Sequence, residues 1–341
     1  MATTVLVTGA TGFVGLHLVE RLLAAGARVV GVSQDEPDVL ARRFLAGTQP
    51  AATFVCGDVR DRDLLLAISR REHADRFVHA AAITPSPEVE RASPAAVVDV
   101  NLTGTVAVLE AARECRARRV VLLSSSGLYG PPDAADRLVT EDAPLQISGL
   151  YSICKLAGEH IGRRYATLYG LSVIAARVGT AYGPMDRPMP SRQGMSEVHA
   201  LLHAAIHNTA VSVFGAGVRR DFCYADDVGE MLARLALART LTWDTYNVGS
   251  GAAHAVREVA AQVAQLFPGF AWQSVEDPAS ADVVVLPAKA RGALDCSRAI
   301  RDLDYRPRYQ LATGLAAYAA WLRAHALHDG TRSGRPLAAD R

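Results

Sequence analysis

Three polar residues near the middle of the sequence have the types and spacing needed for acid–base chemistry at a hydroxyl group. Tyr151 and Lys155 are four residues apart in a stretch with helical periodicity, so their side chains leave the same face one turn apart. A free tyrosine has a pKa of about 10, and a neighbouring ammonium group favours its phenolate. Ser125, at the end of an apolar run, can hydrogen-bond a substrate oxygen that gains charge. These three residues form the candidate catalytic set.

A glycine-rich turn near the N-terminus is typical of a dinucleotide-binding loop. The apolar run VLVTG leads directly into glycines spaced G-x-x-G-x-x-G, and an amphipathic stretch follows as far as Gly26. Glycines let the backbone approach a pyrophosphate, which the amide groups of the following helix N-terminus then hold. The predicted cofactor contacts in this loop are Gly9, Thr11, Gly12, Phe13, Val14 and Gly15.

The elements that must position these motifs alternate between short β-branched runs and longer amphipathic stretches up to about residue 177. Continuous apolar strands separated by helices indicate a parallel sheet covered on both faces. The prediction is therefore an α/β, doubly wound, Rossmann-type sheet. The predicted strands begin at 5, 28, 53, 76, 119 and 172, and the predicted helices span 13–25, 94–116 and 150–169.

After residue 183 this regular alternation stops at a proline-rich polar loop. Strand-like pieces at 211–215 and 244–251 alternate with helices at 196–208, 225–240 and 254–267. We predict a mainly NAD(P)-binding domain at 1–183 and a smaller C-terminal α/β substrate lobe at 184–328. Some strands and helices of the second part are expected to return to the first. Residues 329–341 are polar without a periodic apolar face, and we expect a flexible tail.

Composition describes an ordinary globular protein. Lysine plus arginine (36) nearly balance aspartate plus glutamate (35), so net charge gives no sign of nucleic-acid or membrane binding, and a small-molecule substrate is the expected partner. The five cysteines are scattered singly, which suits reduced thiols in a cytoplasmic protein. The N-terminus lacks the pattern of a secretory signal, and no run reaches 18 apolar residues. We expect a cytoplasmic protein without a membrane partner.

Several ordered motifs resemble the extended short-chain dehydrogenase/reductase family, in particular its NAD-dependent epimerase/dehydratase branch. The resemblance covers about residues 3–325 and includes the glycine loop, Gly57-Asp58, HAAA at 79–82, SSSGLYG at 124–130, YSICK at 151–155, RDF at 220–222 and YNVG at 246–249. It implies a homodimer paired through the helices at 94–116 and 150–169. The further cofactor contacts expected are Ser33, Asp58, Val59, Ala80, Ala81, Ala82, Asn101, Tyr151 and Lys155. For Asn101, a plain helix-start residue is an equal alternative.

The choice between NAD and NADP depends on the end of the second strand, where a carboxylate binds the adenosine ribose and repels a 2′-phosphate. That position is Ser33, which can bond a hydroxyl or a phosphate, and Asp35 follows two residues later. Arg42 and Arg43 can approach a phosphate or simply face solvent. Both cofactors stay open.

The residues after Ser125 bear on the reaction. Family dehydratases and decarboxylases place an acid there, whereas this chain has Ser126 and Gly127. Two reactions stay open: epimerisation of a nucleotide sugar through a keto intermediate, which we favour slightly, and oxidation or reduction of a small hydroxy acid or polyol. A non-catalytic dinucleotide-binding regulator is a third hypothesis, which the intact catalytic set opposes.

The expected substrate contacts are Ser126, Arg192, Arg220 and Arg291. Arg220 matches the arginine that family members place on a nucleotide-sugar diphosphate, although an ion pair with Asp221 or Asp226 is an alternative. The segment 289–293 departs from the family's Arg-Pro-Gly-Asp pattern, which weighs against a diphosphate. Histidines at 199, 203 and 207 share helical spacing but have no carboxylate cluster beside them, so we predict no metal site.

Overall fold

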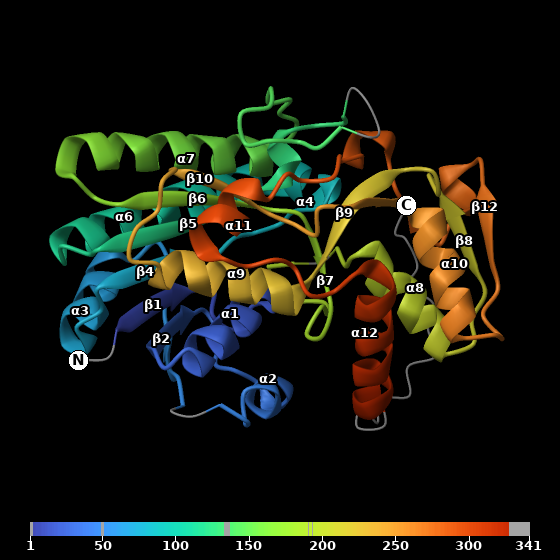
Figure 1. The fold of residues 1–341 in the computed structure, drawn as a ribbon, viewed down its shortest axis with the longest axis horizontal. Helices are drawn as coiled ribbons and strands as arrows, with labels where there is room; N and C mark the ends of the chain where they lie inside the picture. The colour runs from blue at the N-terminus through green and yellow to red at the C-terminus, as the bar shows by residue number, and fades with distance from the viewer. Residues whose placement is uncertain (1–2, 49–50, 133–136, 190, 193, 327–341) are drawn as a thin grey trace.

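A seven-stranded parallel sheet forms the centre of the larger lobe (Figure 1). The computed structural model describes residues 3–48, 51–132, 137–189, 191–192 and 194–326, so the predicted tail at 329–341 lies outside the described residues. The strand order is β3-β2-β1-β4-β5-β6-β10, which confirms the predicted doubly wound fold. The strands are β1 (Thr4–Thr8), β2 (Arg28–Ser33), β3 (Thr53–Cys56), β4 (Arg76–His79), β5 (Arg119–Ser125), β6 (Val173–Val178) and β10 (Thr245–Val248).

Helices cover both faces of this sheet because successive strand residues point to opposite sides. Val5 and Val7 pack with α1 (Phe13–Ala24) and α9 (Ala225–Leu237) in one buried cluster. Leu6, between them, packs on the other face, which is covered by α3 (Arg62–Glu72), α6 (Gly104–Glu114) and α7 (Leu150–Tyr169) (Figure 1). Two apolar layers therefore hold the sheet, and its strand ends are left for the site.

The predicted helix at 94–116 is built from three consecutive pieces. α5 (Pro94–Val98) is followed by one π-helical turn, Asp99–Thr103, and then by α6. By length and hydropathy the run Pro94–Glu114 could cross a membrane, but half of its apolar window is buried in this fold. A π-helical turn inside an α-helix is frequent at functional sites.

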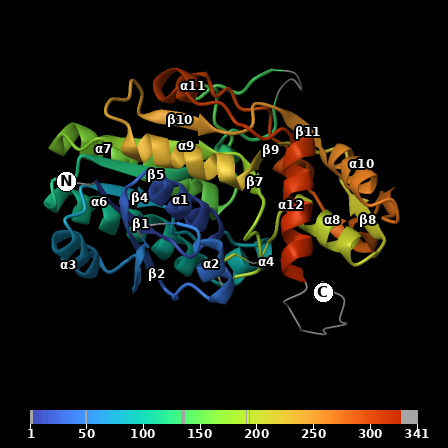
Figure 2. The same ribbon diagram turned by 60° about the horizontal axis from the view of Figure 1, so that its bottom comes forward.

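The smaller lobe is built on two three-stranded sheets (Figure 2). One consists of β8 (Val211–Phe214), β12 (Trp272–Val275) and β13 (Val283–Val284), and it packs with α8 (Glu197–Ile206), α10 (Val256–Leu266) and α12 (Leu311–Ala326). The other consists of β7 (Thr180–Tyr182), β9 (Arg219–Tyr224) and β11 (Ala253–Ala255).

The second half of the chain contributes to both lobes. β10 adds to the edge of the large sheet beside β6, α9 packs on α1, and α11 (Ser297–Leu303) packs on α9 and β10. The remaining short helices are α2 (Val39–Phe44), α4 (Pro87–Ala92) and 3₁₀ turns at Ser126–Leu128, Pro278–Ser280 and Pro287–Lys289. Because the chain crosses between the lobes several times, segments of both border the same edge of the sheet.

Candidate active site

The predicted motifs meet at the carboxyl edge of the large sheet. The strand order reverses between β1 and β4, and a crevice outside the carboxyl ends at such a point is where open α/β sheets bind ligands. The glycine loop follows β1, the HAAA motif begins at the last residue of β4, and Ser125 is the last residue of β5.

The glycine loop has the shape that a pyrophosphate requires. Gly9 has a φ of +69°, and a Cβ there would lie 2.6 Å from the backbone nitrogen of Ala81. A Cβ on Gly15 would lie 2.0 Å from the carbonyl oxygen of Gly9. α1 begins directly after Gly12 with no side-chain cap and no acidic residue in its first turn. The backbone cradle and the free helix N-terminus fit a dinucleotide.

Ser33 contacts the glycine loop. Its hydroxyl oxygen accepts a hydrogen bond from the Thr11 backbone nitrogen at 3.1 Å, so both predicted contacts are at least partly used within the protein. Asp35 is exposed just beyond the strand end, and Glu36 forms a 3.0 Å ion pair with Arg42. Acidic groups thus dominate the end of β2, and Arg42 is neutralised.

Two other predicted cofactor residues are fixed by neighbours. Asp58 lies after β3, and its carboxylate accepts hydrogen bonds from the backbone and the guanidinium of Arg60. Asn101 is buried in the π-helical turn, and its carboxamide exchanges two 2.9 Å hydrogen bonds with the backbone of Ile83. Asn101 therefore holds the loop after β4 and does not start a helix. Val59 is buried near Gly104.

His79, the first residue of the HAAA motif, is a buried connector. One ring nitrogen lies 2.8 Å from the Thr8 hydroxyl and the other 3.0 Å from the Thr105 hydroxyl. Burial, together with the nearby charge of Lys155, lowers the pKa of His79 to about 3, so its ring is neutral. The residue ties β1 and β4 to the helix beside them.

The structure brings the three candidate catalytic residues together. The side chains of Ser125 and Thr84 lie close enough to the Tyr151 phenol to lower its pKa. The Ser125 oxygen accepts a 3.0 Å hydrogen bond from the Gly127 backbone nitrogen, which leaves its own O–H to donate. Lys155 is buried, and its Nζ lies 5.6 Å from the centre of the Tyr151 ring. The three side chains therefore form one centre that can exchange a proton with a substrate hydroxyl group.

The expectation that the neighbouring Lys155 ammonium favours the Tyr151 phenolate is wrong for this arrangement. Burial raises the pKa of Tyr151 to about 12, while the nearby Ser125 and Thr84 side chains and the charge of Arg192 oppose that rise. Burial also lowers the pKa of Lys155 to about 8. Lys155 lies over the ring, and its charge is not among the groups that shift the pKa of the phenol.

Thr84 is a site residue that the sequence did not indicate. It lies on the loop after β4, where its backbone nitrogen donates a 3.1 Å hydrogen bond to the Ser191 carbonyl. Asn101 anchors the preceding residue. The signal available was its position two residues after the HAAA motif, at the carboxyl edge where functional loops gather.

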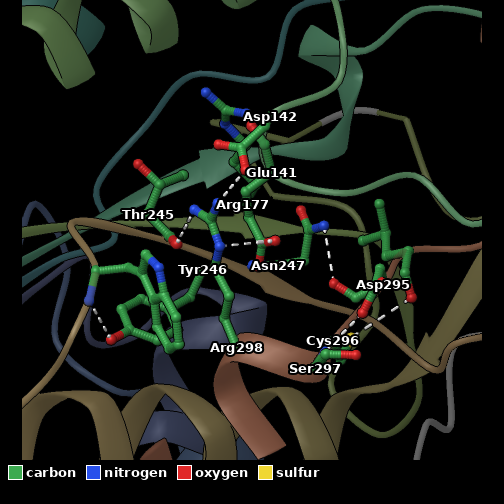
Figure 3. Close-up of polar contacts among 12 residues, drawn as sticks. Glu141, Asp142, Arg177, Thr245, Tyr246, Asn247, Asp295, Cys296, Ser297 and Arg298 are labelled. Atoms are coloured by element: carbon green, nitrogen blue, oxygen red, sulfur yellow. Dashed lines mark hydrogen bonds and ion pairs between the residues drawn. The ribbon is translucent and has the colours of Figure 1, made fainter. Parts of the chain in front are cut away.

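A buried polar network lies behind the catalytic set. Glu159 continues the face of α7 that carries Tyr151 and Lys155, and its carboxylate accepts hydrogen bonds from Ser124 at 2.5 Å and from Arg177 at 2.9 and 2.7 Å. Arg177 also donates to the Glu141 carbonyl at 2.9 Å (Figure 3). The network therefore fixes α7 against the residue that precedes Ser125.

Arg220 and Arg291 lie close enough to influence each other. Arg220 forms an ion pair with Glu197 on α8, and its buried Nε has no hydrogen-bond partner among the described residues. The predicted ion-pair partners, Asp221 and Asp226, are wrong. Asp221 follows Arg220 on a strand, so the two side chains point to opposite faces.

Arg291 has no acidic partner within ion-pair distance in the part of the chain that the structure describes. Its Nη1 donates to the carbonyl oxygens of Ala288 and Ala290 at 2.7 and 2.6 Å. Its Nη2 lies 3.8 Å from where a Cβ on Gly127 would stand, beside the catalytic serine turn. Burial and the charge of Arg220 lower the pKa of Arg291 to about 10. This cation faces the site uncompensated.

A cavity of about 290 Å³ adjoins Arg291 between the lobes. Pro131 and Pro132 line it on one side, and residues 217–219 and 287–292 contribute to the other. Ser126, the fourth predicted substrate contact, is buried in the 3₁₀ turn after Ser125.

Arg192 lies at the catalytic end of the site but is neutralised. It forms an ion pair with the buried Asp186, and its guanidinium lies 4.8 Å from the centre of the Phe13 ring. Its charge nevertheless acts on Tyr151.

The helical histidines are engaged with protein groups. His199 Nδ1 lies 2.9 Å from the Tyr318 hydroxyl, and His207 Nδ1 bonds the His203 carbonyl at 2.8 Å. Across the described ranges, one group of metal-ligand types converges within 4.8 Å: His17, Glu20 and Asp226. The carboxylate of Asp226 pairs with Arg21 and Arg308, whose charges oppose a metal cation.

Known proteins resemble this chain along most of its length. The profile of the NAD dependent epimerase/dehydratase family matches residues 5–249. A UDP-glucose 4-epimerase of Mycolicibacterium smegmatis is 32% identical over 93% of this chain and 98% of its own. A dTDP-glucose 4,6-dehydratase of Streptomyces antibioticus is 30% identical over 93% and 92%. The Thermus thermophilus UDP-glucose 4-epimerase complex with NAD superposes with a TM-score of 0.79 at 27% identity, covering 94% and 99% of the two chains.

Proposed function

Because the chain belongs to the NAD-dependent epimerase/dehydratase family, we propose that it is a nucleotide-sugar epimerase that works through a keto intermediate with bound NAD. The observation that carries this proposal is the uncompensated Arg291 beside Arg220, next to the catalytic serine turn. Arg220 keeps its ion pair with Glu197, so the uncompensated charge is that of Arg291, and the two guanidinium groups together suit a ligand with two adjacent negative groups. A nucleoside diphosphate has that charge. Residues 289–293 differ from the family's Arg-Pro-Gly-Asp pattern, but they still include Arg291, so a diphosphate ligand stays compatible with this segment.

The orientation of the substrate follows from the order of the groups. The sugar lies at Ser125 and Tyr151, the diphosphate lies at Arg220 and Arg291, and the nucleoside extends toward the cavity beside Arg291. UDP-linked hexoses are the first candidates, since the relatives include enzymes that are named for them.

The residues beside Ser125 favour epimerisation over dehydration. Neither position 126 nor position 127 is an acidic residue, and the carboxylates that border the site are already bound by other protein groups. Asp186 pairs with Arg192, and Glu90 accepts the Leu150 backbone N–H at 3.1 Å at the start of α7. A dehydratase needs a free acid to protonate its leaving hydroxyl.

Each catalytic residue has one task in this mechanism. Tyr151 removes the proton of the sugar hydroxyl and later returns it, while the Ser125 O–H hydrogen-bonds the oxygen that becomes the carbonyl. The Ser125 and Thr84 side chains and the positive charge of Arg192 all lower the pKa of Tyr151 from its buried value. NAD, when bound, supplies the hydride chemistry. Lys155 would hold its nicotinamide ribose.

NAD is favoured over NADP by the charges at the end of β2. Asp35 is exposed there, and Glu36 neutralises Arg42. A carboxylate in this position accepts hydrogen bonds from the ribose hydroxyls of NAD and repels the 2′-phosphate of NADP.

We further propose a cytoplasmic homodimer formed through α6 and α7. Ile153, Leu168 and Tyr169 on α7 are each about half exposed, which leaves apolar surface for a second copy. The five cysteines are unpaired thiols, as the cytoplasm maintains them. Light scattering tests the dimer, and a monomeric mass would refute it.

The proposed function is tested by denaturing freshly purified protein and separating the released nucleotide. An epimerase recycles its cofactor, so close to one NAD or NADH per chain is expected. The alternative, a dehydrogenase of a small hydroxy acid or polyol, exchanges its cofactor every turnover. An empty site that fills only when NAD or NADP is added would favour that alternative.

A further inference from the structure

The Asp221 carboxylate, on β9, is buried among neutral donors. The residue is 1% exposed, and its Oδ1 accepts hydrogen bonds from the backbone nitrogen and hydroxyl of Ser250, both at 2.7 Å. Its Oδ2 accepts from the backbone nitrogens of Gly251 at 3.2 Å and Leu294 at 2.9 Å. Within the described ranges no cation lies at ion-pair distance, so the charge is held by four hydrogen bonds alone.

These hydrogen bonds tie together three separate segments at the substrate side of the site. Asp221 follows Arg220 on β9, whereas Leu294 lies three residues after Arg291. The Arg291 backbone nitrogen also donates a 2.9 Å hydrogen bond to the Arg219 carbonyl, so the two arginine-bearing segments run side by side. The Asp221 carboxylate adds a second connection between these two segments through its hydrogen bond from the Leu294 backbone nitrogen.

We propose that Asp221 is a positioning residue that fixes the spacing between the Arg220 and Arg291 guanidinium groups. It touches no substrate itself. This inference rests on the proposed function, in which those two groups hold a diphosphate. Few side chains other than a carboxylate accept four N–H and O–H donors from three directions, and backbone donors hold the Arg291 segment more rigidly than a flexible lysine or arginine would.

An Asp221→Asn change keeps the volume and removes two acceptor positions. Its NH₂ group would face the backbone N–H of Ser250 on one side or those of Gly251 and Leu294 on the other, so at least one buried donor loses its partner. We expect the 291–294 segment to loosen, and with it the guanidinium pair.

The experiment measures uridine diphosphate binding to the NAD-loaded protein by calorimetry, in a double-mutant cycle. Asp221→Asn is expected to weaken binding roughly tenfold or more, and Arg291→Ala is expected to weaken it similarly. The double variant should bind no more weakly than the weaker single variant, because Asp221 acts through Arg291. For the nucleotide-sugar reaction, Asp221→Asn should raise KM and leave kcat and NAD content unchanged.

Asp302→Asn is the matched control. Asp302 likewise accepts only neutral donors, from Thr242 and Tyr246, but it lies on α11, and none of these hydrogen bonds reaches the arginine-bearing segments. The Asp302→Asn variant should bind uridine diphosphate with an affinity within twofold of that of the parent protein. Ser250→Ala, which removes one donor and leaves the backbone intact, covers the case in which Asp221→Asn does not fold, and about a threefold weakening is expected.

The outcomes separate the two claims. If Arg291→Ala leaves uridine diphosphate binding unchanged, the diphosphate site itself is wrong and the role of Asp221 falls with it. If Arg291→Ala weakens binding but Asp221→Asn and Ser250→Ala do not, or if the losses simply add, the positioning role alone is overturned.

Discussion

Replacing Arg177 by methionine should destabilise the protein strongly, because it removes the closest and only buried cation of a buried carboxylate. The side chains of Arg177 and Glu159 are 4% and 1% exposed, and their closest contact is 2.7 Å. After the change, Glu159 keeps Ser124 and the Arg163 guanidinium, which lies 3.5 Å away and is one-third exposed. Breaking a buried pair from one side costs about 3–5 kcal/mol.

Urea unfolding of the NAD-loaded protein measures this loss, and thermal unfolding should show a midpoint lower by roughly 4–7 °C. Arg163→Met is the matched control, since it removes a guanidinium from the same carboxylate at its exposed side and should cost less than about 1 kcal/mol. A double Glu159→Leu and Arg177→Met variant should recover part of the stability. An Arg177→Met protein within about 1 kcal/mol of the parent would refute the reasoning.

Three further predictions concern the site. Tyr151→Phe should lower kcat by roughly a hundredfold or more while bound NAD stays at the parent level; an unchanged kcat would exclude this residue as the acid–base group. Thr84→Val removes the hydroxyl that lowers the pKa of Tyr151, so the rise of kcat with pH should move to higher pH and activity at pH 7 should fall. Thr84→Ser should restore the parent pH profile, and coincident profiles for all three proteins would contradict the contact. Asp35→Ala should narrow the preference for NAD over NADP in nucleotide-uptake assays, and an unchanged ratio would place the discriminating group elsewhere.

The elements that the sequence predicts correctly are those determined by neighbouring residues in the chain. The helix around Tyr151 and Lys155 was expected at 150–169 and spans Leu150–Tyr169, because a 20-residue amphipathic pattern with a following glycine fixes both its phase and its end. The glycine loop was equally local, since strand, turn and helix are consecutive in the sequence. The doubly wound sheet followed from the alternation of such units.

What depends on tertiary placement could not be read from the sequence. The partner of Arg220 is Glu197, 23 residues earlier on another element, and no spacing rule links them. Thr84 reaches Tyr151 only because Asn101 holds the loop after β4. The pKa of Tyr151 has the same origin: sequence spacing shows the nearby lysine, whereas the burial that raises this pKa arises from the whole fold.

The central claim, epimerisation of a nucleotide sugar with recycled NAD, is tested most directly by incubating the purified protein with UDP-glucose or UDP-glucuronate and no added cofactor. We predict conversion to the C4 epimer of at least one of them, with no accumulation of NADH and with loss of conversion in Tyr151→Phe. Formation of NADH in proportion to the substrate consumed, on adding NAD and a hydroxy acid or polyol, with neither nucleotide sugar epimerised, would contradict the account.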